Sequence, residues 1–260
     1  MRTTRLILLV TAVGLSRAAE AEEVAGDISD SPVIDPTSSA TAEGSFLPLT
    51  LPARVGATAA FAFVSGGYDT ARQGAAAEAT AEARIWGPLA LRAGATYSGA
   101  AGQMRPSIGA RVQVLRQEAH GVDASVSVLY KAEGFTGPEG EIETCASLAR
   151  RFERVSLHGN LAYGQDPEGN ERDGEVRLAL VHPRGRWVLG LDSRARFAIG
   201  AQHDKDAVTE PTFDALGGPI GILVMGRFVL FAQAGPSVVK LPGQGTKAGM
   251  GSFGGLGATF

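Results

Sequence analysis

Length, composition and charge limit what this sequence can be. Its 260 residues are 44% hydrophobic and 20% charged, which suits one sizeable folded domain and excludes a chain that is disordered throughout. The formal net charge of -3 lacks the basic surplus of nucleic-acid-binding proteins. A single cysteine, Cys145, excludes an internal disulfide and a thiolate zinc cluster, and no motif calls for a metal or another cofactor.

Residues 1–21 have the three parts of a secretory signal peptide. Arg2 and Arg5 give a basic start, residues 6–15 (LILLVTAVGL) form an apolar run, and small residues then allow cleavage after Ala18 or Ala21. The apolar run is too short to cross a bilayer as a helix, and no other run approaches that length. Any membrane span must therefore be built from strands.

Residues 22–52 differ in composition from the rest of the chain. Between positions 20 and 50 there are seven Asp or Glu residues and three prolines, with neither Lys nor Arg. Such a composition is typical of a disordered, solvated linker. We expect an acidic disordered periplasmic segment here; the alternative is a periplasmic arm or plug.

From residue 53 onward, apolar and polar residues alternate in repeated segments. The clearest is residues 122–133 (VDASVSVLYKAE), where only Leu129 interrupts the alternation. A period of two puts the apolar side chains on one face of a strand, and a tilted strand crosses the bilayer hydrocarbon in about 9 to 11 residues. The sequence predicts about twelve strands, at residues 54–64, 75–86, 89–98, 107–116, 122–133, 142–152, 155–164, 175–182, 187–200, 212–226, 228–239 and 249–260.

One of these segments also has helical character. Residues 75–83 (AAAEATAEA) have high helix propensity, with Glu78 and Glu82 four positions apart. The alternation nevertheless holds through Ile85, and the turn at residues 87–88 needs a strand on both sides. We therefore predict a strand.

The connections between the segments alternate in length. The short ones are residues 87–88, 119–121, 153–154, 183–186 and 226–227. The longer ones, rich in polar residues, Gly or Pro, are residues 65–74, 99–106, 134–141, 165–174, 201–211 and 240–248. This plan resembles Gram-negative outer-membrane β-barrels, which have short periplasmic turns and long outer loops.

The resemblance covers residues 53–260 and implies an all-β fold, a transmembrane antiparallel up-and-down β-barrel. It also implies location in the outer membrane, in contact with its lipid, after the signal peptide is removed. The last segment ends in Phe260, with Leu256 and Ala258 on the same face, which resembles the signal that the barrel-assembly machinery recognises in this family. Two aromatic bands are expected at the bilayer interfaces, formed by Trp86, Phe152, Trp187 and Phe228 near the short turns and by Tyr97, Tyr130, Tyr163 and Phe197 near the long loops.

The opposite parity of each strand should line the lumen. The predicted inward set is Glu78, Glu82, Arg84, Arg92, Arg111, Gln113, Asp123, Lys131, Glu133, Glu143, Arg151, His158, Asn160, Glu175, Arg177, Asp192, Arg194, Arg196 and Gln233. Hairpin register predicts that Glu82 faces Arg92. It also predicts a cluster with a positive excess, formed by Glu175, Arg177, Asp192, Arg194 and Arg196. These residues and Arg111 are the candidates for setting ion selectivity; the alternative is a set of salt bridges that braces the barrel.

Ser156, His158 and Asn160 share one strand face and resemble the catalytic set of the outer-membrane phospholipase. Their order is reversed, however, and their face points inward. Alternate residues on a strand are about 6.5 to 7 Å apart, which is too far for a direct hydrogen bond between Ser and His. We therefore predict a polar lining and no catalytic residues.

These observations favour a narrow passive channel for small polar or charged solutes. The first alternative is a non-conducting structural or adhesive barrel that binds partners through its long loops. A lipid-modifying enzyme of the outer membrane is a more distant third.

Overall fold

The computed structural model describes residues 60–99, 103–132, 140–167, 172–199 and 211–260. The predicted signal peptide and acidic segment lie outside these residues. Contacts divide the chain into Met1–Val33 and Ile34–Phe260, and every described residue belongs to the second unit. Within the described ranges, no helix is long and apolar enough to span a membrane.

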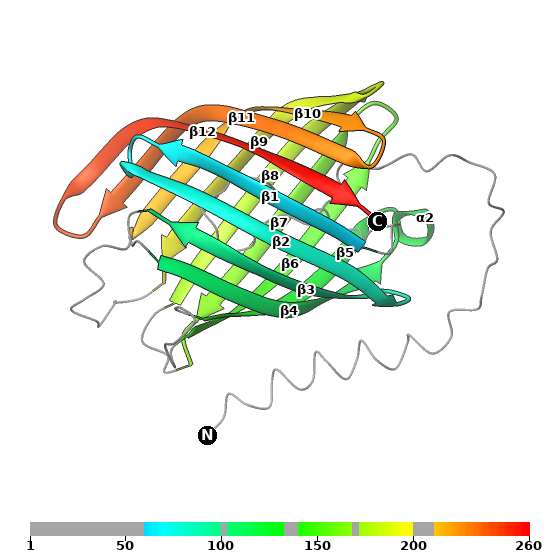
Figure 1. Ribbon diagram of the computed structural model, residues 1–260, viewed down its shortest axis with the longest axis horizontal. Coiled ribbons are helices and arrows are strands. Elements are labelled where there is room, and N and C mark those ends of the chain that lie inside the picture. Colours follow the sequence, from blue (N-terminus) through cyan, green and yellow to red (C-terminus); the bar gives the residue numbers. More distant parts are fainter. Residues whose placement is uncertain (1–59, 100–102, 133–139, 168–171, 200–210) are drawn as a thin grey trace. The chain divides into compact units, whose positions relative to one another are not determined.

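Twelve antiparallel strands close into one barrel (Figure 1). Each strand pairs with its neighbours in the chain, and β1 pairs with β12 from Phe61↔Thr259 to Asp69↔Gly251. The predicted fold class is confirmed. The described elements are β1 (Ala60–Asp69), β2 (Gly74–Trp86), β3 (Leu89–Ser98), β4 (Gln103–Leu115), α2 (Gln117–His120), β5 (Asp123–Ala132), β6 (Gly140–Arg151), β7 (Ser156–Gln165), β8 (Arg172–Arg184), β9 (Trp187–Ala198), β10 (Phe213–Met225), β11 (Phe228–Leu241) and β12 (Gly245–Thr259).

Three of the connections predicted to be long are short. The β3–β4 connection, predicted at residues 99–106, is residues 99–102, because β4 begins at Gln103. Residues 65–69 belong to β1 and not to a loop, because they pair with both β12 and β2, as in Ser65↔Gly255 and Ser65↔Glu78. The β1–β2 connection is therefore residues 70–73, and the β11–β12 connection is residues 242–244. The β4–β5 connection, predicted as a tight turn, contains the helix α2.

Alternate side chains on the strands form two surfaces of opposite character. On the outer surface, large apolar side chains such as Ile108, Leu161 and Leu191 are at least 60% exposed. On the inner surface, ionisable side chains are buried, and Arg111 is only 1% exposed. A soluble monomer rarely exposes apolar surface on this scale, whereas a membrane barrel presents it to lipid.

The predicted aromatic residues lie exposed on the outer surface, near the strand ends for which they were predicted. Trp187 and Phe197 both lie on β9, and residues 187 to 197, at about 3.4 Å each and tilted by about 40°, span a height of roughly 26 Å. That height matches the apolar band of a membrane barrel, about 25 Å. Phe260 is also exposed, and its backbone N–H donates to the carbonyl of Ala60 (2.9 Å), at the seam of the barrel. Its recognition by the assembly machinery stays a prediction.

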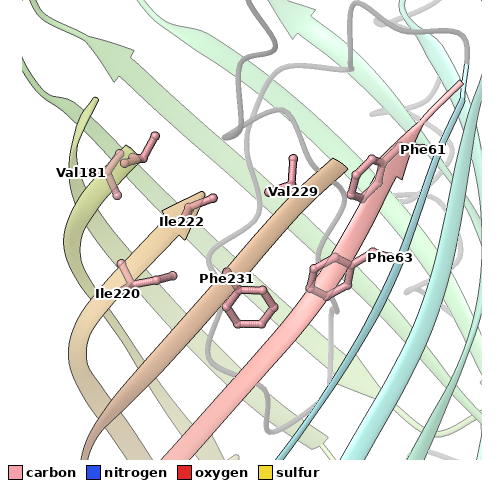
Figure 2. Packing of buried hydrophobic residues seen from close by; sticks show 8 residues of the cluster. Phe61, Phe63, Val181, Ile220, Ile222, Val229 and Phe231 are labelled. Atoms are coloured by element: carbon pink, nitrogen blue, oxygen red, sulfur yellow. The ribbon is translucent and has the colours of Figure 1, made fainter. Parts of the chain in front are cut away.

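Part of the inner wall is apolar (Figure 2). Near the short-turn end, Phe63 stacks on Phe231 with ring centroids 5.3 Å apart, and Phe61 lies next to Phe63. β12 lies between β1, which carries Phe61 and Phe63, and β11, which carries Phe231, and it has Gly255 and Gly257 at this level. A Cβ at Gly255 would lie 2.3 Å from the Phe231 ring, and one at Gly257 would lie 2.6 Å from the Phe61 ring. The apolar cluster consists of Phe61, Phe63, Val181, Val188, Ile220, Ile222, Val229 and Phe231.

Candidate functional site

The eight predicted selectivity candidates all lie on the inner wall. Arg196 is partly exposed, and the other seven are buried. Their parity was therefore predicted correctly, whereas their role in ion selectivity stays a prediction. The seven buried candidates are Glu82, Arg92, Arg111, Glu175, Arg177, Asp192 and Arg194.

A first group of charges joins β2, β3 and β4. Glu82 faces Arg92 in the β2–β3 register, as predicted. Arg111, on β4, donates from Nη2 to Glu82 Oε1 at 2.5 Å, which connects strands that are not neighbours. Both partners are almost completely removed from solvent, so each needs the other's charge.

A second group forms an alternating ladder on β8, β9 and β10. The β8–β9 register places Glu175 beside Arg196 and Arg177 beside Arg194, as predicted. Arg177 pairs with Glu175, and Arg194 Nε lies 3.9 Å from Glu175 Oε2. Arg194 Nη2 also donates to Oδ1 of Asp214 on β10 at 2.5 Å. Arg72, from the β1–β2 turn, pairs with the other oxygen of Asp214. We call the series Arg72, Asp214, Arg194, Glu175 and Arg177 the charge ladder.

The predicted positive excess of this group was wrong, because the structure adds Asp173 and Asp214 as well as Arg72 to the five predicted residues. Asp214 and Asp173 were not among the predicted lumen residues, yet Asp214 pairs with Arg194, and Asp173 accepts from Arg196 Nε at 2.5 Å. On β10 the other inward side chains are apolar, so no polar alternation marked Asp214. The group now holds equal formal charges of each sign, with four cations (Arg72, Arg177, Arg194, Arg196) and four carboxylates (Asp173, Glu175, Asp192, Asp214).

Most of the remaining inward predictions hold. Lys131 pairs with Glu143 across β5 and β6, and both are buried. Arg151 lies 3.8 Å from the buried Asp123. Arg84 pairs with the inward Ala90, so its parity was predicted correctly, but it is exposed because it lies at the short-turn end of β2. Glu133 lies outside the described residues.

The Ser156, His158 and Asn160 side chains are buried on the inner wall of β7. Asn160 donates from Nδ2 to Ser147 Oγ on β6 at 2.7 Å. Their position inside the barrel keeps them away from the lipid-facing surface, which fits the predicted polar lining. No group of three metal-ligating side chains occurs within the described residues.

A cavity of about 50 Å³ lies at the long-loop end of the lumen. That volume admits only a few water molecules. Most inward charges deeper in the described strands, such as Arg111 and Glu82, are less than 10% exposed, so solvent has little access to them below the cavity. The charged residues that line it are Arg105, Lys131, Glu141, Asp166, Arg172, Asp173 and Arg196.

The sequence matches no known protein family and no curated protein. In structure, the chain is similar to an outer-membrane channel from Pseudomonas putida F1, with a TM-score of 0.56 and 10% identity over 85% of this chain and 100% of that one. It is also similar to the NanC porin (TM-score 0.55, 7% identity, 76% of this chain and 100% of that one). The KdgM porin gives a TM-score of 0.51 and 5% identity over 77% of this chain and 99% of that one.

The chain has the fold of an outer-membrane β-barrel. At these identities the likeness concerns the fold alone. Within an outer-membrane barrel, charges on the inner wall tune selectivity, whereas charges on the lipid face lower stability. The ladder and the Glu82–Arg111 pair lie on the inner wall.

Proposed function

We propose that this protein is a narrow passive channel of the outer membrane for small polar or charged solutes. The charged inner wall carries the proposal. Among the described residues, five cationic and eight acidic side chains are buried: Arg92, Arg111, Lys131, Arg177 and Arg194, with Asp69, Glu78, Glu82, Asp123, Glu143, Glu175, Asp192 and Asp214.

A barrel that only needs a filled interior has a less costly solution. Buried ion pairs carry a desolvation cost that often cancels their attraction, and apolar side chains of similar volume are commonly as stable or more so. This barrel uses that solution at the short-turn end, where Phe61, Phe63 and Phe231 fill the wall. Keeping thirteen charged groups elsewhere in the lumen is therefore better explained by a role in ion passage, when these side chains move, than by bracing alone.

The channel should be narrow and weakly cation-selective. Twelve strands lie between the small barrels that side chains fill and the large open porins. The low exposure of the inward charges means that ions pass only when these side chains move aside, so the conductance should be small. The formal excess of buried carboxylates, eight against five, favours cations in a low-dielectric lumen. Similarity to proteins described as porins and as an outer-membrane channel supports the proposal.

The test is single-channel recording of the purified protein in planar bilayers, with a potassium chloride gradient. We expect small discrete conductance steps and a reversal potential displaced toward that of potassium. The same preparation should come from outer-membrane fractions and show heat-modifiable migration on gels, which reports a folded barrel. A folded barrel that stays electrically silent would reject the channel.

The second candidate is a non-conducting barrel, and the low exposure of the inward charges favours it. Its role would be structural or adhesive, through the long-loop end. The recording separates the two candidates, because heat-modifiable protein without conductance is the result that this candidate predicts.

A further inference from the structure

The β1–β2 turn, residues 70–73, folds into the mouth of the barrel. Ala71, in the middle of this turn, is only 2% exposed. Asp69 holds the turn from below, because its Oδ1 accepts from the backbone N–H groups of Ala71 (2.8 Å) and Arg72 (3.3 Å). The same oxygen accepts from Ser237 Oγ on β11 at 2.8 Å. We call residues 70–73 the inward turn.

The strand β12 is shaped to receive the inward turn. Thr70 N–H donates to the carbonyl of Met250 (3.0 Å), and Met250 N–H donates to Thr70 Oγ1 (2.7 Å). A Cβ at Gly249 would lie 2.4 Å from Thr70 Oγ1 and 2.5 Å from the Ala71 nitrogen, so no other residue fits at 249 while the turn keeps this position. The inward turn is therefore seated on the wall.

Arg72 extends the inward turn along the inner wall, past two strands. In the barrel, β12 and β11 separate β1 from β10, yet Arg72 pairs with Asp214 of β10. Arg72 is 14% exposed and Asp214 is 3% exposed at the side chain, so the pair lies between solvent and the buried ladder. Asp214 in turn binds Arg194, which joins the turn to the charges of β9 and β8. A short turn thus places one cation over the mouth and ties it to the wall by charge.

We infer that the inward turn is the constriction of this barrel, that the Arg72–Asp214 ion pair holds it in the lumen, and that Arg72 is a specificity-determining residue. The role in specificity rests on the proposed channel function; the role of the ion pair does not. An ion that enters from the long-loop end passes the Arg72 cation before it reaches the buried Asp214–Arg194 pair, and this cation opposes cations and attracts anions. Loss of Arg72 releases the turn and removes that charge, so the lumen becomes wider and more acidic.

The holding role is tested by the accessibility of residue 71. Ala71→Cys is made in a Cys145→Ser background, and its reaction with a membrane-impermeant maleimide is timed on the folded barrel. We expect slow labelling in the parent, and about tenfold faster labelling in Arg72→Gln or Asp214→Asn. A tenfold change is the size of effect expected for an ion pair whose exposure is intermediate between that of a surface pair and that of a buried pair. Combining the two changes should add little to the faster single variant. Arg72→Lys, which keeps the charge, and Arg84→Gln, at an exposed site near the short turns, should leave the rate close to that of the parent.

The same variants are recorded in planar bilayers. Arg72→Gln should increase the single-channel conductance and shift the reversal potential toward cations, and Arg72→Lys should do neither. Unchanged labelling in both Arg72→Gln and Asp214→Asn would overturn the holding role whatever the conductance. Faster labelling with unaltered conductance and reversal potential would overturn the constriction. Faster labelling in barrels that never conduct would leave the holding role standing and reject the channel itself.

Discussion

Replacing Leu191 by Arg tests whether the outer surface faces lipid. Leu191 is 60% exposed on β9, four residues above Trp187, which at about 3.4 Å per residue and a tilt of about 40° is a height of roughly 10 Å. In an apolar band of about 25 Å this is close to the midplane, where Arg costs about 2 to 4 kcal/mol of unfolding free energy. Ile199, two residues beyond Phe197 on the same side, provides the matched control, because Arg near the interface costs about 0 to 1 kcal/mol.

The assay is reversible urea unfolding of the barrel refolded in phospholipid vesicles. Trp86 and Trp187 are exposed on the outer surface, so their fluorescence reports the transfer from bilayer to water. Leu191→Ala removes the side chain without adding charge and separates lost contact from the cost of the cation. Surface changes in soluble proteins usually alter the free energy of unfolding by no more than about 0.5 kcal/mol. If the unfolding free energies of Leu191→Arg and Ile199→Arg were both within that range of the parent, the interpretation that this surface faces lipid would be wrong.

Three further predictions concern the lumen and the orientation. Glu82→Gln or Arg111→Met should each lower the free energy of unfolding by about 3 kcal/mol, because the remaining partner is left as an unpaired buried charge. The double variant should lose less than the sum of the two. Strict additivity in a double-mutant cycle would show that the two side chains do not stabilise each other. The double change Arg194→Ser and Arg196→Ser leaves two cations against four carboxylates in the group on β8, β9 and β10, so the reversal potential should shift toward that of the cation. A lower free energy of unfolding with an unchanged reversal potential would mean that these charges only brace the barrel. Epitope tags within residues 165–174 or 201–211 should react with antibody on intact cells and tags within residues 20–50 should not, whereas the reverse pattern would invert the orientation.

The sequence predicted contacts that depend on one hairpin and missed those that depend on closure of the barrel. Glu82 and Arg92 are neighbours across a two-residue turn, so alternation and turn position are enough to pair them. Arg111 lies on β4 and contacts Glu82 on β2, beyond the intervening strand β3. Strand register predicts which residues are neighbours on adjacent strands, but it does not predict in which direction a long side chain extends. Arg72 and Asp214 are further apart still, and their meeting requires the β1–β12 seam that only the closed structure supplies.

Glycine was the misleading signal at the first strand. Gly66 and Gly67 indicated a loop, since glycine is common in turns. In the structure both glycines belong to β1 and pair with β12 and β2. A Cβ at Gly67 would lie 2.2 Å from the Phe253 ring on β12. Glycine inside a strand often marks such a close approach, but the sequence does not reveal which ring takes the space. Residues 75–83 were predicted correctly as a strand despite their helix propensity, because they pair with β1 on one side and with β3 on the other.

The interior is divided in a way that restricts where a polar path can run. On β8, β9 and β10 the charges lie toward the long loops, and the short-turn half is apolar, with Val181, Val188 and Ile222. On the opposite wall, charges continue to the short-turn end at Glu82, Arg111 and Asp123. Water and ions are stabilised by the polar wall and not by the apolar one, so a path from the mouth must cross from the ladder toward β2, β4 and β5. The Glu82–Arg111 pair then lies on the route, and the Phe63–Phe231 stack lies beside it. Changes to that pair should therefore alter both stability and ion preference, whereas truncating Phe231 should lower stability and leave the reversal potential unchanged.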